Sequence, residues 1–460
     1  MVKKLNITKS NKLYKKALKI IPMGSQTYSK GVKAFSDGVS PKFLKKGKGC
    51  EVWDVDGNKF IDYVMANQPL ILGYADPDVN NAIKKQLNLG STFSVSNKLE
   101  IDVAELLKKH IPDADGARFG KNGADATSIA VRLSRAITKR QHIAFCGYHG
   151  WHDWFIGTTN LNSGIPKFNN QLAHSFIYND ISSLEKIFSK YKKKIACIIM
   201  EPITVNGPKS KPSGSTKWND YNEKNNFLTD VKKLCRKNGA LLIFDEVITG
   251  FRYDIGGAQK MFNVIPDLSC WAKAMSNGVP ISAITGNWKY LKYLEKTFFS
   301  FTYGGDCIGL AAAKATINKI EKKNVIDHLY SVGKLLKDNM NELSKIYGLE
   351  ELIECSGYPC RTVMSIRKVK KYNKPLITKT LIQQELMSRG VLWSQYQSIS
   401  FAHKKEHIYK SLNAFEDAFR VLSKIVKSGK KIENSLIGKP CQPFFTRVAD
   451  FNAAALNSKD

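Results

Sequence analysis

The chain has 460 residues, with 71 lysines and arginines against 40 acidic residues, a formal net charge of +31. Hydrophobic residues make up 43% and charged residues 24%, which excludes a disordered chain, a collagen-like fibre and a small disulfide-stapled domain. Only 11 of the 71 basic residues are arginines, and the lysines are spread along the whole chain. We therefore interpret the charge as a lysine-rich surface and expect no nucleic-acid partner.

The nine cysteines include no Cys-x-x-Cys pair and no zinc-finger spacing. Several lie in apolar runs, as small hydrophobic residues do, so we expect reduced thiols, a cytoplasmic location and no metal site. The N-terminus is basic but lacks the apolar core of about 7 to 15 residues that marks a secretory signal. The sequence contains no run of about 20 apolar residues, so we expect no membrane partner.

The first predicted element is a basic amphipathic helix over residues 10–22. Residues 50–63 alternate around an Asp-Gly turn signal, which predicts a hairpin. Asn97 is positioned to cap a helix, with Glu100 three residues further on. The spacing of apolar residues predicts helices over residues 77–90, 97–111 and 123–140, and Asn97 would cap the second of them.

Four short apolar runs then alternate with helical patterns, at 142–146, 195–200, 240–244 and 281–285. Apolar runs separated by helices predict a parallel sheet buried on both faces, and therefore an α/β fold. Each run ends in polar residues or glycine. Because ligands bind beyond the carboxyl ends of the strands in such sheets, we expect the functional residues there.

Beyond residue 324 the pattern changes. A long helix comes first, followed by an irregular segment that contains Gly357 and Pro359. Further helices are predicted over 374–389 and 404–428. This order indicates a smaller C-terminal α+β domain.

Two segments place a charged residue in apolar surroundings. Asp245 ends the run over 240–244, and a buried carboxylate must be paired because an isolated buried charge costs several kcal/mol. Its partner is either the amide of a following helix, as in an ordinary cap, or a cationic ring nitrogen. Lys273 lies in the apolar segment 271–275; most lysines are solvated, but a desolvated one has a lowered pKa and can form a Schiff base.

Two further segments would complete a cofactor site. The turn Asn122-Gly123-Ala124 opens a helix, and backbone amides at a helix N-terminus bind anions. Tyr148, followed by His149, comes directly after the strand over 142–146 and offers an aromatic ring to a flat group. A plain cap and a core aromatic explain each feature alone. Together, the lysine, the acid, the anion-binding turn and the ring predict a pyridoxal 5'-phosphate site.

With these motifs the chain resembles the class III aminotransferases of pyridoxal-phosphate fold type I, above all the glutamate-1-semialdehyde 2,1-aminomutase branch. The likeness runs from about residue 14 to about 425 and includes NGADATSIAVRLSR (122–135), LLIFDEVITGFR (241–252) and WAKAMSNGVPISA (271–283). It implies an α/β fold with a mainly parallel central sheet. The implied parts are an N-terminal segment (1–65), a large cofactor-binding domain (66–323), a small α+β C-terminal domain (324–428) and an extension without an assigned role (429–460).

The resemblance also implies a role for each motif residue. Lys273 would form the aldimine with the cofactor and Asp245 would pair with the pyridine nitrogen, so these two are the predicted catalytic residues. Thr302 would reach the phosphate bound by a neighbouring subunit in a homodimer. The other predicted cofactor-binding residues are Asn122, Gly123, Ala124, Tyr148, His149, Glu201, Asn206 and Val247.

The predicted reaction moves an amino group between a small-molecule donor and a carbonyl compound. An aminomutase, which returns the amine to the same molecule, is the alternative. Four departures favour the aminotransferase. Ala124 stands where the family has a hydroxyl, and Asn67 stands where the branch has an aromatic ring. The turn over 276–280 replaces a Gly-rich turn of the branch, and Lys33 lies near the position of its substrate-binding arginine. A non-catalytic protein on this fold is less favoured, because Lys273 and Asp245 are both present.

Overall fold

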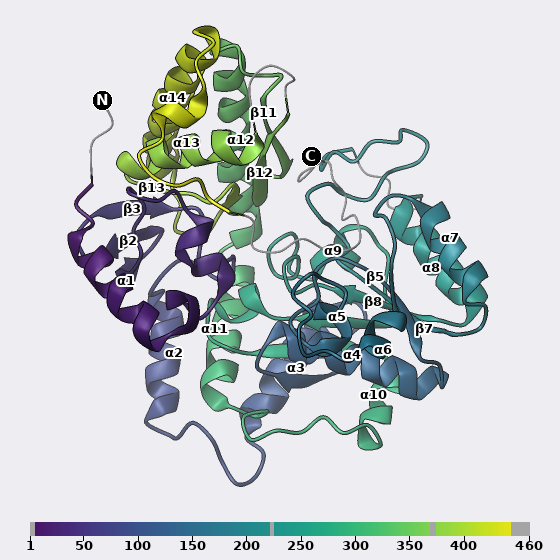
Figure 1. Ribbon diagram of the computed structural model, residues 1–460. Helices are drawn as coiled ribbons and strands as arrows, with labels where there is room; N and C mark the ends of the chain where they lie inside the picture. Colours follow the sequence, from purple (N-terminus) through teal and green to yellow (C-terminus); the bar gives the residue numbers. More distant parts are fainter. Residues whose placement is uncertain (1–4, 221–224, 369–373, 443–460) are drawn as a thin grey trace.

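The computed structural model describes residues 5–220, 225–368 and 374–442, and all statements below concern this part of the chain. The predicted C-terminal extension is thus described only as far as residue 442, and the remainder lies outside the described residues. In Figure 1 the C-terminal helices lie above the N-terminal strands, and the large sheet with its helices lies below and to one side.

A seven-stranded sheet, in the order β4-β10-β9-β8-β7-β5-β6, forms the core of the large domain. The predicted strands over 142–146, 195–200 and 240–244 are confirmed to within one residue. β7 and β8 are buried along their whole length, as expected for strands covered on both faces. The strands are β4 (Gly116–Gly120), β5 (His142–Cys146), β6 (Ala173–Ser175), β7 (Ile195–Met200), β8 (Leu241–Asp245), β9 (Leu268–Trp271) and β10 (Ser282–Gly286).

The prediction that the fourth apolar run lies parallel to the others is wrong. It forms β10, which pairs antiparallel with both β9 and β4. Only the segment 272–281 joins β9 to β10, and a parallel crossover needs a dozen or more residues, so the chain turns back. Sequence patterning misses β4, β6 and β9 because they are short and show no clear alternation.

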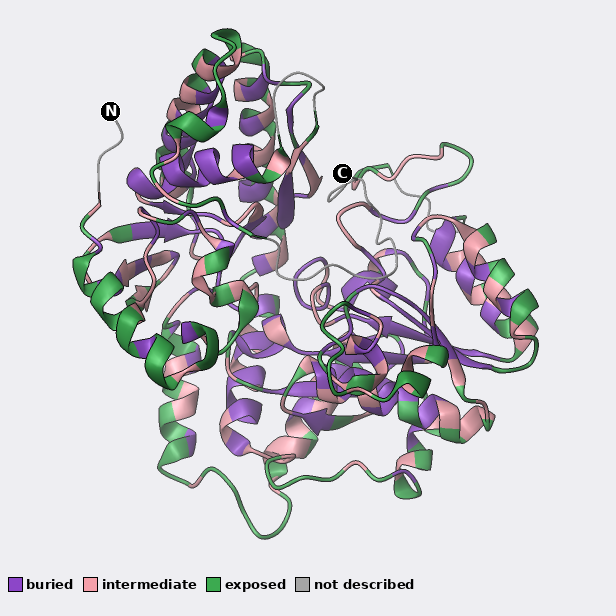
Figure 2. Cartoon of the chain, viewed as in Figure 1, coloured by how far each residue is buried: buried purple, intermediate pink, exposed green. Residues whose placement is uncertain are grey.

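Helices cover both faces of this sheet, with α4 and α10 on one side and α3, α8 and α11 on the other. Figure 2 shows the strands buried and the outer faces of α7 and α8 exposed. The predicted cap of α3 is confirmed: Asn97 Oδ1 accepts from Leu99 N (3.0 Å), and Glu100 Oε1 accepts from Asn97 N (2.9 Å). The helices are α2 (Pro77–Leu87), α3 (Lys98–His110), α4 (Gly123–Thr138), α5 (Asp153–Ile156), α6 (Lys167–Gln171), α7 (Ile181–Lys190), α8 (Phe227–Asn238), α9 (Gly257–Met261), α10 (Trp288–Leu291) and α11 (Cys307–Lys322).

The C-terminal part packs α12 (Val325–Ile346), α13 (Pro375–Ser388) and α14 (Lys405–Lys427) beside a sheet of β11 (Ile353–Tyr358), β12 (Arg361–Ile366) and β14 (Tyr396–Ser398). The segment predicted to be irregular is therefore a hairpin. Tyr358 is in register with Arg361, so Pro359 and Cys360 form its turn. The sequence does not reveal it, because this turn lacks the Asn-Gly or Asp-Gly pair that marks most short hairpins.

The N-terminal segment consists of α1 (Thr8–Ile20) and the strands β1 (Leu44–Lys48), β2 (Glu51–Asp54) and β3 (Lys59–Asp62). The predicted hairpin is confirmed as β2 and β3. β3 also pairs in parallel with β13 (Val391–Leu392), so the N-terminal segment and the C-terminal part share one sheet. The described part of the extension lies on α13, where Cys441 N donates to Thr380 Oγ1 (3.1 Å).

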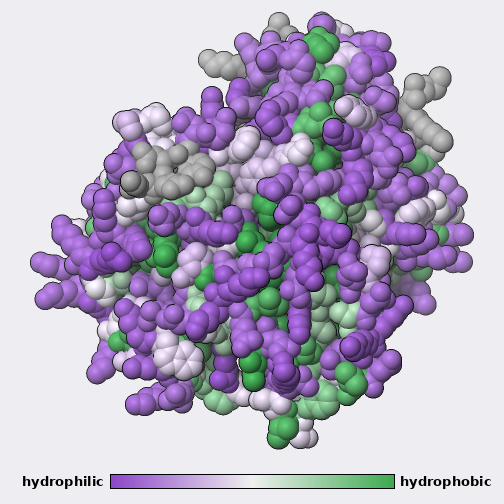
Figure 3. Space-filling view, turned by 180° about the vertical axis from the view of Figure 1, so that it is seen from behind, coloured by the Kyte–Doolittle hydropathy of each residue, from purple (hydrophilic) through white to green (hydrophobic). Residues whose placement is uncertain are grey.

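The surface in Figure 3 is mainly hydrophilic, with apolar residues gathered in a broken band over the lower half of that face. Among the described helices, none is both long and apolar enough to cross a membrane.

Candidate active site

Four strand ends lie side by side at one edge of the central sheet. β9, β8, β7 and β5 are parallel neighbours, and Asp245 at the end of β8 is in register with Cys270 of β9. The residues that follow the other three strands include Lys273, Glu201 and Tyr148. The fold therefore brings together predicted site residues that lie more than 100 positions apart in the sequence.

Lys273 follows β9 in a left-handed backbone conformation, with φ of 44°. Residues with a side chain adopt this region at a cost, and such strain often accompanies functional sites. Burial lowers the pKa of the Lys273 amine to about 8, although the negative charges of Asp245 and Glu201 oppose the shift. The positive charges of Arg361 and Arg252 add to it. A lowered pKa makes the neutral, nucleophilic amine accessible near neutral pH.

Asp245 is only 3% exposed, and both of its carboxylate oxygens are paired. Oδ2 lies 2.7 Å from Nδ1 of His149, and Oδ1 accepts from Val247 N at 3.1 Å. Because an ionised carboxylate only accepts, Nδ1 of His149 carries the proton. The hydrogen bond to Val247 N is the local bond that an ordinary cap would make. The hydrogen bond to His149 comes from a residue that follows a different strand, β5, and it orients the carboxylate.

The N-terminus of α4 approaches Val247, two residues after Asp245, through a glycine. A Cβ on Gly123 would come within 2.9 Å of Val247 Cγ1, so a larger residue would force the helix away. The carboxylate of Asp125 accepts from Asn122 N at 2.7 Å and closes the turn. The amides of Gly123 and Ala124 lie in the first turn of the helix, where no intrahelical acceptor exists, and are suited to an anion.

The remaining large-domain residues line the same edge. Glu201 Oε1 accepts from Tyr148 N at 2.7 Å, which joins the ends of β7 and β5. The Tyr148 ring is 41% exposed and packs edge-to-face on Phe155, with ring centroids 5.4 Å apart. Asn206 is half-buried in the segment that follows Glu201. Tyr148 is thus placed at the same edge as Glu201, where an aromatic ring can stack on a flat group.

Sequence reasoning misses two buried arginines near this edge, Arg252 and Arg361. Arg252 is fully buried and donates to Gln68 O (2.9 Å), Ile399 O (2.7 Å) and Cys360 O (3.3 Å). It thereby fastens the turn over 65–68, in which all four residues have positive φ between 46° and 84°. Arg252 lies inside a recognisable motif, but nothing in the sequence separates it from a surface arginine.

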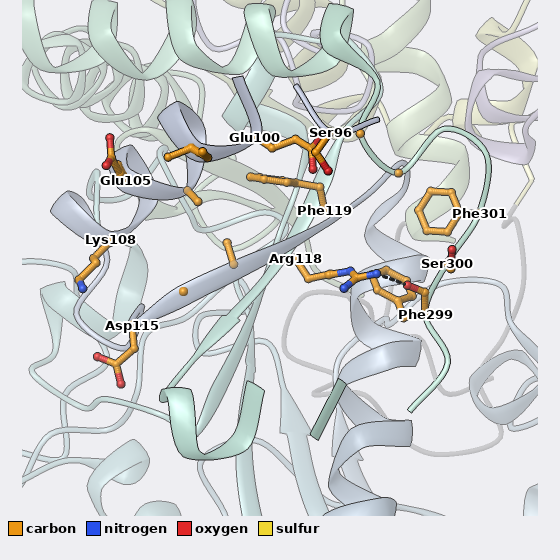
Figure 4. Close-up of a pocket in the computed structure, with 16 residues that line it drawn as sticks. Ser96, Glu100, Glu105, Lys108, Asp115, Arg118, Phe119, Phe299, Ser300 and Phe301 are labelled. Atoms are coloured by element: carbon orange, nitrogen blue, oxygen red, sulfur yellow. Dashed lines mark hydrogen bonds between the residues drawn. The ribbon is translucent and has the colours of Figure 1, made fainter. Parts of the chain in front are cut away.

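Thr302 is the one predicted residue that lies apart from this group within the chain. It is exposed on the loop before α11 and lines a hollow of about 330 Å³ with Glu100 and residues 92–97. An adjoining hollow of about 560 Å³ lies between α3, β4 and the loop over 299–305. Figure 4 shows its aromatic lining and the bond from Arg118 to the carbonyl of Phe299, 3.1 Å. Lys273 lines neither of these two hollows. The candidate active site is therefore identified by the residues at the strand ends and not by these hollows.

The residues at the strand ends fit a flat, phosphorylated aldehyde such as pyridoxal phosphate. A neutral amine can bond to the carbonyl, a buried and oriented carboxylate can face a ring nitrogen, and exposed helix amides can hold a phosphate. The fit depends on Gly123, whose missing Cβ lets the N-terminus of α4 lie close to Val247.

Comparison with known proteins agrees with this chemistry. The family model described as aminotransferase class-III matches residues 34–419. A 3-aminobutyryl-CoA aminotransferase from Cloacimonas acidaminovorans is 32% identical over 93% of this chain and 100% of its own. A glutamate-1-semialdehyde 2,1-aminomutase from Sulfurihydrogenibium sp. is also 32% identical, over 91% of this chain and 100% of its own. The solved internal-aldimine structure of the Sphingopyxis sp. MTA144 FumI protein superposes with a TM-score of 0.82 at 26% identity, covering 94% of this chain and 100% of its own.

Proposed function

The chain belongs to the class III aminotransferases and is a pyridoxal-phosphate-dependent enzyme, and from this premise we propose that Lys273 and Asp245 carry the amino transfer. The donor is a small-molecule amine and the acceptor a carbonyl compound. The observation that carries the proposal is the half-buried Lys273, the pKa of whose amine is lowered to about 8 one strand away from the carboxylate of Asp245.

Pyridoxal phosphate, when bound, supplies an electron sink for the negative charge that develops on the reacting substrate carbon. In the proposal, Nζ of Lys273 would take the proton from that carbon and pass it to C4′ of the cofactor, and the reverse shift would serve the second substrate. Asp245, oriented by His149, holds a proton on the ring nitrogen and acts through its charge. The amides of Gly123 and Ala124 bind the phosphate.

The other predicted residues would bind the ring. Val247 and Tyr148 would pack on its two faces, since Val247 lies close to Gly123 of the phosphate turn and Tyr148 follows β5 at the same edge of the sheet. Glu201 and Asn206 would lie beside the ring hydroxyl. These contacts exclude water from the reacting atoms, which strengthens the charge interactions there.

Borohydride reduction followed by peptide mass analysis tests the assignment. We expect the purified holoenzyme to absorb in the visible, the band to disappear on reduction, and the pyridoxyl group to be found on Lys273. A pyridoxyl group on another lysine, or a protein that cannot be loaded with the cofactor, would refute the proposal.

The aminomutase remains the second candidate, because curated relatives at 32% identity bear that name. Incubation with glutamate-1-semialdehyde alone separates the two. Conversion without a second substrate would indicate the aminomutase, whereas a requirement for a separate keto acid would indicate the aminotransferase.

We also propose a homodimer in which Thr302 completes the phosphate site of the partner. Exposed apolar side chains near Thr302, including Phe93, Val95 (80% exposed) and Tyr303, support a protein interface there. The nine free, buried cysteines support a reducing, cytoplasmic location.

Mixing Lys273→Ala with Thr302→Ala protein tests the dimer. A mixed dimer contains one site with both native residues, so activity should rise above that of either parent. If Thr302 acted within its own chain, mixing would give no gain.

A further inference from the structure

A third hollow, of about 410 Å³, lies in the N-terminal segment. Its lining comes from the end of α1 and the residues that follow it, from the segments 41–44 and 62–67, and from β13. Phe35, Val64 and Leu392 of this lining belong to a small apolar core, which forms one wall of the hollow. Sites for small molecules in proteins typically have volumes of about 300 to 1,000 Å³ and mainly apolar walls, and this hollow has both properties.

The charged residues of the lining offer little to a charged ligand. They are Lys30, Lys42 and Asp62. Asp62 is only 1% exposed, and its Oδ2 accepts from the Tyr74 hydroxyl at 2.6 Å. Lys42 forms an ion pair with Asp37 (3.4 Å), and Lys30 is exposed to water. A charged group that entered the hollow would lose water without gaining a free ionic partner, whereas an apolar group would bury its surface at no such cost.

The wall of the hollow is connected to the proposed reacting amine. Asn67 Nδ2 donates to Ser29 Oγ at 2.7 Å, and both residues line the hollow. The next residue, Gln68, accepts at its carbonyl from Arg252 Nη2 at 2.9 Å. The charge of Arg252 in turn acts on the amine of Lys273. The hollow is therefore separated from the active site by one turn of the chain.

A second set of bonds fixes the hollow relative to the turn that follows Lys273. The segment 64–74 contributes to the lining, and it also binds Asn277, four residues after the lysine. Asn277 Oδ1 accepts from Leu72 N, and Asn277 Nδ2 donates to Gly73 O, each at 2.9 Å. One segment thus forms a wall of the hollow and supports the backbone that carries the reacting amine.

We propose that this hollow holds an uncharged, apolar group of the amino substrate, a branched or aromatic side chain, while the amine of the substrate reacts at Lys273. The walls of the hollow provide aromatic rings, including Phe35 and Phe43, on which such a group can pack. The inference rests on the proposed amino transfer, because it assigns the substrate class of that reaction.

Two matched pairs of amino donors test the proposal: n-butylamine with 4-phenylbutylamine, and 3-aminobutyrate with 3-amino-5-phenylpentanoate. Each pair shares its reacting end and differs by a terminal phenyl ring. We expect kcat/KM of the wild-type holoenzyme to be about 10- to 100-fold higher for the phenyl member of a pair, because its ring leaves water. An equal kcat/KM within both pairs, or no turnover of either phenyl donor, would overturn the inference.

A variant that fills the hollow locates the effect. Val32→Trp should lower kcat/KM for the phenyl donor by about tenfold or more and should act less on the donor without the ring, since only the ring competes with the new side chain. Leu13→Trp is the matched control, because Leu13 is 40% exposed on α1 and lies outside the lining, and it should keep the preference of the wild type. An equal loss for both donors in Val32→Trp would indicate a structural role and contradict the proposal.

Calorimetric titration of the holoenzyme with 4-phenyl-1-butanol, which has no amine, gives a readout without turnover. We expect the wild type to bind this alcohol, the amino donor to compete with it, and Val32→Trp to bind it at least tenfold more weakly. No binding to the wild type, or binding that the donor does not displace, would refute the proposal even if the variant failed to fold. Failure of the reduction experiment at Lys273 would refute the amino transfer separately.

Discussion

Replacing Lys273 by methionine should stabilise the cofactor-free protein at pH 7. The change removes an ammonium group that the fold holds in a poorly solvated place. The pKa falls from the ordinary 10.5 to about 8, which corresponds to about 3 kcal/mol at about 1.4 kcal/mol per pH unit. Because the residue is half-buried and water screens part of this cost, we expect a gain of about 1 to 3 kcal/mol in the free energy of unfolding.

The pH dependence distinguishes this effect from a gain in apolar packing. Below pH 8 Lys273 is protonated in both the folded and the unfolded chain, so the full cost of the buried charge is present. Between pH 8 and 10.5 the unfolded chain binds more protons than the folded one, and the stability of the wild type rises with pH. The advantage of the methionine variant should therefore shrink over that window, while any packing gain stays constant.

Urea denaturation of both apoproteins at pH 7 and pH 10.5 measures the difference. Lys237→Met, on the exposed part of α8, is the control and should show no such dependence on pH. An equal difference between the Lys273 variant and the wild type at both pH values would refute the reasoning, because it would mean that the amine carries no buried charge.

Three other predictions concern neighbouring residues. Asp245→Asn should lower the transamination rate by about 100-fold or more with little change in melting temperature. Glu246→Gln should instead cost about 1 to 3 kcal/mol in the free energy of unfolding, because the Glu246 carboxylate accepts from Ala258 N and Gln259 N at 2.9 Å each. Kinetics and calorimetry on both variants check this, and a reversed pattern would contradict it. Gly123→Ala should weaken retention of pyridoxal phosphate at least tenfold, measured by dialysis, because the new Cβ would lie 2.9 Å from Val247; unchanged retention would contradict the role of the turn. Asn97→Ala should cost about 1 kcal/mol in urea unfolding, and no measurable loss would show that water replaces the cap.

The features predicted from short stretches of sequence are largely confirmed by the fold. The apolar runs became β5, β7 and β8, and Asn97 with Glu100 formed the predicted cap, because burial and capping depend on residues close together in the chain. The direction of β10 could not be read in the same way. Its apolar composition is the same for either direction, and the short connection after Lys273 decides it.

The chemistry is predictable from short stretches of sequence: a lysine in apolar surroundings, an acid at a strand end and a glycine turn identify the cofactor, since each is recognisable from its immediate neighbours. How these groups are charged and paired depends on the fold. His149 reaches Asp245 across 96 positions, and Arg361 lies buried although its segment reads as irregular. Pairing depends on contacts between distant strands, which local patterns do not reveal.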